Sequence, residues 1–226
     1  ALEEDEPVGD AGVVTHRLRK VFGSATKPSV VGLDLQMRRG QITALLGANG
    51  AGKTTTIAML TGLIPPTSGD ATIDGRRCST EMRTIRESLG VCPQQNVLFE
   101  PLSPTLHLRL FGALKGLRGA ELHKAIDALL QMVMLSERAH VKSAVLSGGQ
   151  KRKLCLAISL IGGSSTLFLD EPTSGMDPHA RRFTWDLLRG QREGRTVVLP
   201  TPNPGPTPSP KPTLGRSLSL RLLVSL

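Results

Sequence analysis

Apolar and polar residues near the start of the chain follow the pattern of β-strands. Between residues 12 and 46, stretches such as VVGLDLQM and QITALL alternate as half-buried strands do, with a turn at Arg39 and Gly40. The next segments predict, in order, a helix over residues 53–62, a short strand DATI that ends at Asp74 and Gly75, a helix over residues 81–88 and a strand in SLGVCP.

Helical periodicity dominates the middle of the chain. Between residues 103 and 147, LHLRLFGALKGL and AELHKAIDALLQMVML carry apolar residues at three- and four-residue steps, which predicts helices with one face in the core. The pattern of buried strands returns in STLFLD and TVVL, with a helix over residues 178–189 between them. Strands that alternate with helices indicate a mainly parallel sheet, so we expect an α/β core with an inserted helical lobe.

The two ends of the chain have a different composition. Every even position from Pro200 to Pro212 is proline, which donates no backbone hydrogen bond and restricts the residue before it. We therefore expect the last strand to end at Leu199 and the tail to be polyproline-like or disordered. The predicted divisions are an acidic disordered lead-in over residues 1–11, one domain over 12–199 with its helical lobe at 95–160, and the proline-rich tail over 200–226.

Composition and charge limit the class of protein only loosely. With 226 residues, the chain is long enough for one domain with a sizeable core. The net charge of +9 indicates a basic surface, which is compatible with nucleic acid, an anionic membrane or nucleotide phosphates as partners. The N-terminal ALEEDEPVGD does not resemble a signal peptide, and without a run of about 18 apolar residues we expect no membrane span in this chain.

The spacing of cysteine and histidine residues predicts neither a disulfide framework nor a metal site. The three cysteines lie far apart and lack CxxC spacing, which favours a reducing environment. The histidines are expected to be surface or core residues, and the basic run KRK at residues 151–153 a solvated helix face. The cysteines are Cys78, Cys92 and Cys155, and the histidines concerned are His107, His123, His140 and His179.

The segment GANGAGKTT, residues 47–55, fits the pattern GxxxxGK[ST] between an apolar strand and a predicted helix. Its glycines let backbone N–H groups turn toward phosphate oxygens, and the helix that follows presents its positive end to them. Lys53 would reach the β- and γ-phosphates, and the hydroxyl of Thr54 would bind Mg²⁺. The residues expected to contact the nucleotide are Gly47, Asn49, Gly50, Gly52, Lys53, Thr54 and Thr55.

Two acidic residues follow the buried strand TLFL. Asp170 and Glu171 are expected at the carboxyl end of this strand, where open α/β sheets bind their ligands. Beside a phosphate-binding loop, Asp170 is suited to bind Mg²⁺ directly or through water, and Glu171 to act on the attacking water as general base. The alternative explanation is that the two acids only end the strand and bind no ligand.

LSGGQ, residues 146–150, predicts a second anion site. Its glycines expose backbone N–H groups, Ser147 can cap the helix formed by KRKLCLAISLI, and we expect Ser147, Gly148, Gly149 and Gln150 to contact a phosphate. One nucleotide has only one γ-phosphate. Two phosphate-binding sites in one chain therefore favour a head-to-tail pair of domains. In such a pair, the glycine-rich loop of one domain and LSGGQ of the other bind the same ATP.

Together these motifs resemble the ATP-binding cassette domain of ABC transporters. The segments GQITALLGANGAGKTTTIAMLTGLIPPTSG, TIRESLGVCPQQNVLF, LSGGQKRKLCLAISLIGGS and DEPTSGMDPHARR are most similar to subfamily A, the lipid exporters, and the similarity runs from about residue 12 to Leu199. The resemblance implies an α/β fold with a P-loop NTPase core, a mainly parallel sheet, an N-terminal antiparallel β portion and an inserted α-helical lobe. It also implies ATP and Mg²⁺ as cofactors.

Three further residues take their roles from the resemblance. Phe22 occupies the position of the aromatic residue, usually tyrosine, that stacks on adenine. Gln94 matches the glutamine that senses the γ-phosphate and the metal and couples to the membrane domain, so it is a candidate catalytic and metal-binding residue. Asp177 matches the acidic residue that contacts the partner domain and the nucleotide site between them. As plain alternatives, Gln94 is a loop amide and Asp177 a helix N-cap.

The sequence departs from the family after TVVL. There the family has a histidine that bonds the γ-phosphate and fixes the catalytic glutamate and water, whereas this chain has Pro202. A contact of this kind typically contributes about 10²- to 10⁴-fold in rate, so we expect ATP·Mg²⁺ binding with slow hydrolysis. The remaining strands and helices of the cassette are also missing, which suggests an unspliced intron, a shifted frame or an alternative ending.

The expected function is that of an ATP-binding and hydrolysing domain that powers transport, of lipid by resemblance, through ATP-driven dimerisation. The expected partners are a second cassette and the transmembrane domains of a parent transporter at the cytosolic face of a membrane, with no nucleic acid. Two alternatives remain open: a soluble cassette ATPase without transport, and a catalytically weak ATP-binding module.

Overall fold

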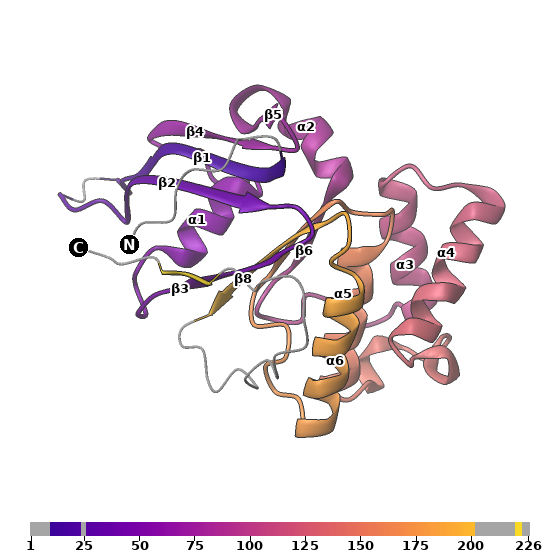
Figure 1. Ribbon diagram of the computed structural model, residues 1–226. Coiled ribbons are helices and arrows are strands. Elements are labelled where there is room, and N and C mark those ends of the chain that lie inside the picture. The colour runs from indigo at the N-terminus through magenta and orange to yellow at the C-terminus, as the bar shows by residue number, and fades with distance from the viewer. Residues whose placement is uncertain (1–9, 24–25, 202–219, 223–226) are drawn as a thin grey trace, which may run out of the picture.

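Two β-sheets organise the part of the chain that the computed structural model describes, namely residues 10–23, 26–201 and 220–222 (Figure 1). The first sheet is antiparallel and has the strand order β2-β1-β4-β5. Gly12, Val13, Thr15 and Leu18 of β1 are buried, so the predicted alternation is only partly regular, and the pairing of β1 with β2 contains register shifts. The strands are β1 (Ala11–Lys20), β2 (Val30–Arg38), β4 (Ser68–Ile73) and β5 (Arg76–Arg77).

The second sheet has the strand order β6-β7-β8-β3-β9, and all of its neighbouring strands are parallel. Parallel pairing brings the carboxyl ends of β3, β6 and β7 to the same edge of the sheet, which is where ligands bind in open α/β sheets. The strands are β3 (Ile42–Leu46), β6 (Leu89–Cys92), β7 (Thr166–Leu169), β8 (Thr196–Thr201) and β9 (Leu220–Leu222).

The helices fall into two groups in Figure 1. Helix α1 lies near the antiparallel sheet, whereas α3 and α4 form a lobe at the opposite side of the molecule, beside α5. The α-helices are α1 (Lys53–Leu60), α2 (Cys78–Ser88), α3 (Pro104–Leu114), α4 (Gly119–Met132), α5 (Gly148–Leu160) and α6 (Pro178–Gly190), and the short 3₁₀ helices are η2 (Ser136–Arg138) and η3 (Ser143–Val145).

The parallel sheet separates two hydrophobic cores because side chains alternate along its strands. Phe168 of β7 and Val198 of β8 point into one core, which they share with the antiparallel sheet, α1 and α2. Their neighbours Leu167 and Val197 point into the other core, which contains α4, α5 and part of α3 and α6. Both faces of the sheet are therefore covered, which explains why its strands are almost uniformly apolar.

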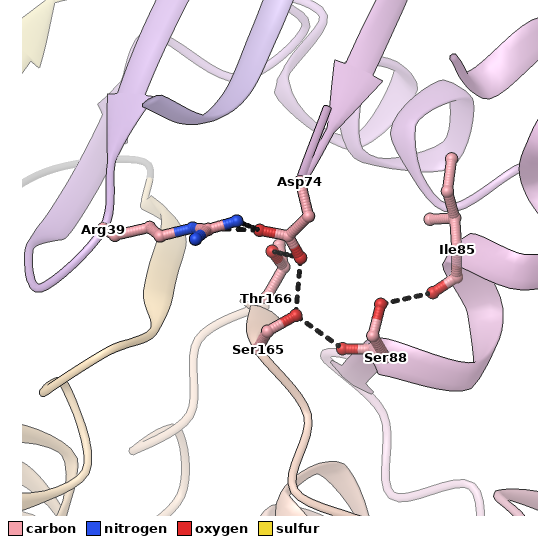
Figure 2. A network of polar contacts seen from close by, with 6 residues as sticks. All are labelled: Arg39, Asp74, Ile85, Ser88, Ser165 and Thr166. Carbon is pink, nitrogen blue, oxygen red and sulfur yellow. Dashed lines mark hydrogen bonds and ion pairs between the residues drawn. The ribbon is translucent and has the colours of Figure 1, made fainter. Parts of the chain in front are cut away.

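Figure 2 shows an ion pair and hydrogen bonds that tie the two sheets together. The network lies beside the start of β7, so it is at the end of the parallel sheet remote from its carboxyl edge. Asp74, directly after β4, accepts from Arg39 at 2.8 Å and from the hydroxyl of Ser165 at 2.5 Å. Ser165 immediately precedes β7 and also contacts the carbonyl of Ser88 at the end of α2. This network fixes the antiparallel sheet against the start of β7.

The structure differs from the sequence prediction at the end of β8. The strand runs to Thr201, and the buried Pro200 pairs with Leu45 of β3, although the strand was expected to end at Leu199. The ladder between β7 and β8 stops at Val198, so at Pro200 the strand is an edge on its β7 side, and proline is tolerated at such edges. The tail was also expected to form no strand, but Leu220–Leu222 pairs with β3 as β9.

Apart from these two strands, the observed elements agree with the predicted α/β fold, including the antiparallel β portion, the mainly parallel sheet and the helical lobe. The three cysteines are free, as expected. None of the helices in the described part of the chain has the length and hydrophobicity that a membrane span requires. The predicted domain boundaries stay predictions, and most of the lead-in and tail lies outside the described residues.

Candidate functional site

The glycine-rich loop connects β3 with α1 in a conformation that requires glycine. Gly50 and Gly52 have φ angles of +87° and +82°, in the left-handed region that other residues seldom adopt. A Cβ atom on Gly52 would also lie 2.3 Å from the carbonyl oxygen of Ser29. Ser29 pairs with Lys20 by a backbone hydrogen bond, so the loop packs closely against the turn that contains Phe22.

The amino end of α1 differs from those of α5 and α6 in how it is capped. Its N-cap residue Gly52 has no side chain, and its first turn contains no acidic residue. In contrast, Ser147 accepts a hydrogen bond from the N–H of Gln150, and Asp177 accepts from those of His179 and Ala180. The first N–H groups of α1 are therefore without a side-chain cap, and an anion can satisfy them.

Lys53, the first residue of α1, folds back over the loop. Its Nζ donates hydrogen bonds to the carbonyl oxygens of Gly47 at 2.6 Å and Ala48 at 2.9 Å. The ammonium group is thus held inside the curve of the loop, close to the helix end. The hydroxyl-bearing Thr54 is exposed, as are Asn49 and Gly50, while Gly47 and Thr55 are half-buried.

The acid pair follows β7 at the carboxyl edge of the parallel sheet. Burial raises the pKa of the half-buried Asp170 above its usual value, and the adjacent Glu171 raises it further, whereas Arg152 and Lys53 lower it. Lys53 therefore lies near enough to Asp170 for their charges to interact. The structure thus places the lysine of the glycine-rich loop near Asp170, the first residue after β7, while the roles of these residues stay predictions.

Glu171 has an unusual backbone. Its φ angle of +46° lies in the left-handed region, which costs a residue other than glycine about 1–3 kcal/mol. Its carbonyl oxygen accepts from the N–H of Ser174 at 3.0 Å and from Arg152 at 2.9 Å. Such a backbone persists only where its surroundings hold it, and strained residues of this kind cluster in functional sites.

Arg152 was missed by the sequence reasoning. The run KRK was expected to be a solvated helix face, but Arg152 is only 2 % exposed, while its neighbours Lys151 and Lys153 are partly exposed. Its guanidinium bonds the carbonyls of the two loops that follow β6 and β7. A signal was present: Cys155 and Leu156, three and four residues later, are apolar, which puts Arg152 on the buried face of α5.

The LSGGQ segment forms a capping box at the start of α5. The side chain of Ser147 accepts from the N–H of Gln150 at 3.2 Å, and the side chain of Gln150 accepts from the N–H of Ser147 at 3.0 Å. A Cβ atom on Gly148 or Gly149 would meet nothing within 4 Å. Among the described residues no hydrogen bond joins this segment to residues 47–55 of the glycine-rich loop.

Phe22, Gln94 and Asp177 lie on loops around these elements. The Phe22 side chain is 47 % exposed, and Lys20 lies 5.3 Å from the centre of its ring. Gln94 is exposed and lies two residues after β6, with its carbonyl bonded to Arg152. Asp177 caps α6, and the backbone N–H of Ala180 lowers its pKa. Pro202 lies outside the described residues.

Comparison with known protein families decides the identity of the chain. The family described as "ABC transporter" matches residues 30–174, which is more than half of the chain. The chain belongs to the ABC transporter family. Its fold is accordingly that of an ABC ATPase cassette, and the predicted P-loop NTPase core is confirmed.

Relatives of the ABC chain include subfamily A proteins. It is 49 % identical over 193 residues to the phospholipid-transporting ATPase ABCA3 of Homo sapiens, covering 84 % of this chain and 11 % of the relative. It is 48 % identical over 200 residues to the phospholipid-transporting ATPase ABCA7 of Homo sapiens, covering 88 % and 9 %. The chain thus spans about a tenth of the length of the curated relatives it matches.

Solved ABC cassettes have the same fold. An ATP-binding subunit of an ABC transporter has a TM-score of 0.76 and 30 % identity, and the match covers 84 % of this chain and 79 % of that one. The cassette MJ0796, solved as a dimer in a post-hydrolysis state with ADP and Pi, has a TM-score of 0.77 and 25 % identity, covering 84 % and 88 %.

Proposed function

We propose that this ABC cassette binds ATP with Mg²⁺ and hydrolyses it slowly, as the nucleotide-binding domain of a lipid transporter. The observation that carries the proposal is the uncapped amino end of α1, with the ammonium of Lys53 inside the same loop. Backbone N–H groups and a fixed positive charge converge at one point, which is the arrangement that binds a polyphosphate. Among the residues that the structure describes, no side chain caps this helix end.

The acidic side of the site fits Mg²⁺. Oxygen ligands suit this ion, and Asp170 and the exposed hydroxyl of Thr54 are available as ligands or as partners of its bound waters. No cluster of three or more His, Cys, Asp or Glu side chains that could hold a metal occurs in the described residues, so phosphate oxygens would have to complete the set. Mg²⁺ bound there supplies positive charge to the phosphates and relieves the repulsion between Asp170 and Glu171.

Hydrolysis would use groups that lie around this point. Glu171 is the general base for the attacking water, and its strained backbone fixes where its side chain begins. Gln94 reaches toward the same edge from the loop after β6 and orients the water and the metal. Lys53 leaves the carbonyls of Gly47 and Ala48 and donates to the phosphates, while Phe22 offers its ring to the adenine base.

Turnover by this chain is slow in our proposal because Pro202 takes the place of the family's histidine. Proline has no side-chain donor and no backbone N–H. The contact that the histidine would make to hold Glu171 and the water in line with the γ-phosphate is therefore lost at this position. Binding through the glycine-rich loop does not depend on this position.

Two such domains pair head to tail in our proposal, so that LSGGQ of one covers the ATP held by the other. Support comes from the uncrowded surroundings of Gly148 and Gly149 and from the amino end of α5 behind them. The related cassette MJ0796 is dimeric in its solved structures. Asp177, which is exposed at the start of α6, is the candidate contact to the partner domain.

The transmembrane part of the transporter would dock beside the loop that carries Gln94. Leu106, Leu110 and Leu114 recur every four residues on α3 and are exposed, as are Val97 and Phe99 in the preceding loop. An apolar surface of this kind suits a protein partner more than solvent. The position would place the domain at the cytosolic face of a membrane, and the relatives' names make phospholipid the proposed cargo.

Two other functions would use the same site. A soluble cassette ATPase without transport would need no partner on the apolar surface of α3. A catalytically silent module would bind ATP and never hydrolyse it. The relatives' names favour transport over the first, and the retained Glu171 favours slow turnover over the second.

The test compares binding with hydrolysis in the purified chain and in Glu171→Gln. We expect both proteins to bind MgATP with similar affinity, and the wild type to release phosphate in a slow single turnover that the variant loses by at least about 100-fold. Phosphate release at equal rates by wild type and Glu171→Gln would show that Glu171 takes no part in hydrolysis. Absence of ATP binding by the wild type would overturn the whole proposal.

A further inference from the structure

The buried side chain of Arg152 is the feature that the proposed function leaves unexplained. It lies in the second turn of α5, five residues after Ser147, and is among the largest fully buried side chains of the described residues. A guanidinium is costly to bury unless its donors are satisfied. Its four Nη hydrogen bonds all go to backbone carbonyls, while the buried Nε has no hydrogen-bond partner among the described residues.

The four carbonyls belong to two loops. Nη1 donates to Pro93 and to Gln94, the latter at 3.1 Å. Nη2 donates to Asp170 and to Glu171, the latter at 2.9 Å. The guanidinium is planar and rigid, so one fork fixes the separation of the two loops, which a flexible ammonium could not do.

The location of this fork follows from the sheet. The strands β6 and β7 are paired up to Cys92 and Leu169, and the N–H of Asp170 makes the next hydrogen bond, 2.8 Å from the carbonyl of Cys92. Beyond that point the loops leave the sheet, and their carbonyls have no ladder partner. Arg152 bonds the carbonyls of the first two residues after each strand, and Gln94 and Glu171 are the second of these residues.

We propose that Arg152 is a positioning residue for ATP hydrolysis. It acts through the backbone: by holding the carbonyls of Gln94 and Glu171 in one plane, it sets the two side chains that face the reacting phosphate. Because Arg152 is carried by α5, the helix that begins at LSGGQ, a shift of that helix displaces both side chains together. This inference rests on the proposed function, since it assumes that Gln94 and Glu171 act on ATP.

The effect should be on the chemical step and not on ATP affinity, because in the described part of the chain no hydrogen bond joins Arg152 to Lys53 or to the glycine-rich loop. We compare the full chain with Arg152→Lys, which keeps the charge and loses the fork, and with Arg152→Gln, which keeps two N–H donors. The control is Lys153→Met on the same helix, whose ammonium lies over the ring of Phe183 instead. For each protein we measure the dissociation constant of MgATP, the rate of phosphate release in a single turnover and amide hydrogen exchange.

We expect Arg152→Lys to release phosphate at least about 10-fold more slowly, with a dissociation constant within about threefold of wild type. The amides of residues 94–96, 170–171 and 173–174 should exchange faster in the nucleotide-free variant, while α1 and the antiparallel sheet exchange as in wild type. Lys153→Met should match wild type in all three measurements.

Wild-type rates and wild-type exchange in both Arg152 variants would overturn the proposal. Equal losses of ATP affinity and rate, or unfolding of both variants, would also overturn it, because Arg152 would then be a structural residue only. If the wild-type chain bound no ATP, the proposed function would fail by itself. The exchange of the two loops in the nucleotide-free proteins would still show whether Arg152 joins them.

Discussion

Arg39 and Asp74 form an ion pair with 2.8 Å between Nη2 and Oδ1, and the Nε of Arg39 makes a second hydrogen bond to the same oxygen at 3.2 Å. The Asp74 side chain is 8 % exposed and that of Arg39 45 %. The other oxygen of Asp74 accepts from Ser165. One carboxylate thus joins the turn after β2, the end of β4 and the start of β7.

We expect Asp74→Asn to lower the free energy of unfolding by about 1–3 kcal/mol, because the buried acceptor loses its charge while its partners stay in place. Asparagine keeps the left-handed backbone, φ +50°, at that position, so the loss reports on the network and not on strain. Urea unfolding followed by circular dichroism measures it.

The matched control is Asp186→Asn, which breaks the exposed pair with Arg189, 3.5 Å apart within α6. It should change the free energy of unfolding by less than about 0.5 kcal/mol. Equal effects of the two substitutions would show that the Asp74 network does not hold the two sheets together.

His107 should make stability depend on pH. It is fully buried: its Nε2 accepts from the N–H of Phe99 at 2.9 Å, and its Nδ1 lies 2.9 Å from the carbonyl of Ser103. Because a backbone N–H can only donate, the ring must be neutral. Burial lowers the pKa of His107 below its usual value of 6.5.

The unfolded state therefore binds the proton more tightly than the folded state. The free energy of unfolding contributed by His107 is complete above the unfolded pKa of about 6.5 and falls as the pH drops from there toward the lowered folded pKa. In His107→Gln this loss should disappear. Urea titrations across that window test it, and parallel pH profiles for the two proteins would show that His107 does not titrate on unfolding.

ATP-dependent pairing can be tested at Gly148. A Cβ atom there would meet nothing within 4 Å, and an acidic residue in the first turn of a helix favours folding, so we expect Gly148→Asp to be stable. It would place a negative charge against the phosphates of an ATP bound by the facing domain. In the Glu171→Gln background we expect MgATP to produce dimers in sedimentation velocity, and Gly148→Asp to remain monomeric with unchanged ATP affinity.

Ala120→Asp provides the control for charge, since it adds the same group to the exposed first turn of α4. It should dimerise as the parent variant does. Dimers of Gly148→Asp in MgATP would mean that LSGGQ does not cover the nucleotide of a second domain.

Short sequence patterns were enough to predict the strands, the helices and the loops that carry Lys53, Asp170 and Ser147. Lys53 and Asp170 each lie in a segment where a strand leads into a loop and a helix, and Ser147 directly precedes α5, so neighbours in sequence are neighbours in space. The amino end of α5 is an example. Ser147 and Gln150 are three residues apart and form the capping box that a serine and a glutamine at this spacing predict.

Contacts between distant segments could not be predicted in this way. Arg152 bonds residues 59 and 58 positions before it and 18 and 19 positions after it, and Asp74 bonds Ser165 across 91 positions. The partners of Arg152 are main-chain carbonyls, which look alike in any sequence, and Asp74 and Ser165 are common side chains whose local patterns do not mark them as partners. The extension of β8 through Pro200 likewise depends on where its neighbour β7 ends.

The binding of ATP by Lys53 is the most direct test of the account. Isothermal titration calorimetry of the purified chain with ATP and Mg²⁺ should show one nucleotide per chain, and Lys53→Ala should weaken it by at least about 10-fold, the loss expected for one charge-assisted hydrogen bond. Lys124→Ala, on the exposed face of α4, should bind as wild type does. Wild-type affinity in Lys53→Ala, or no binding by the unmodified chain, would contradict the assignment of the glycine-rich loop as the nucleotide site.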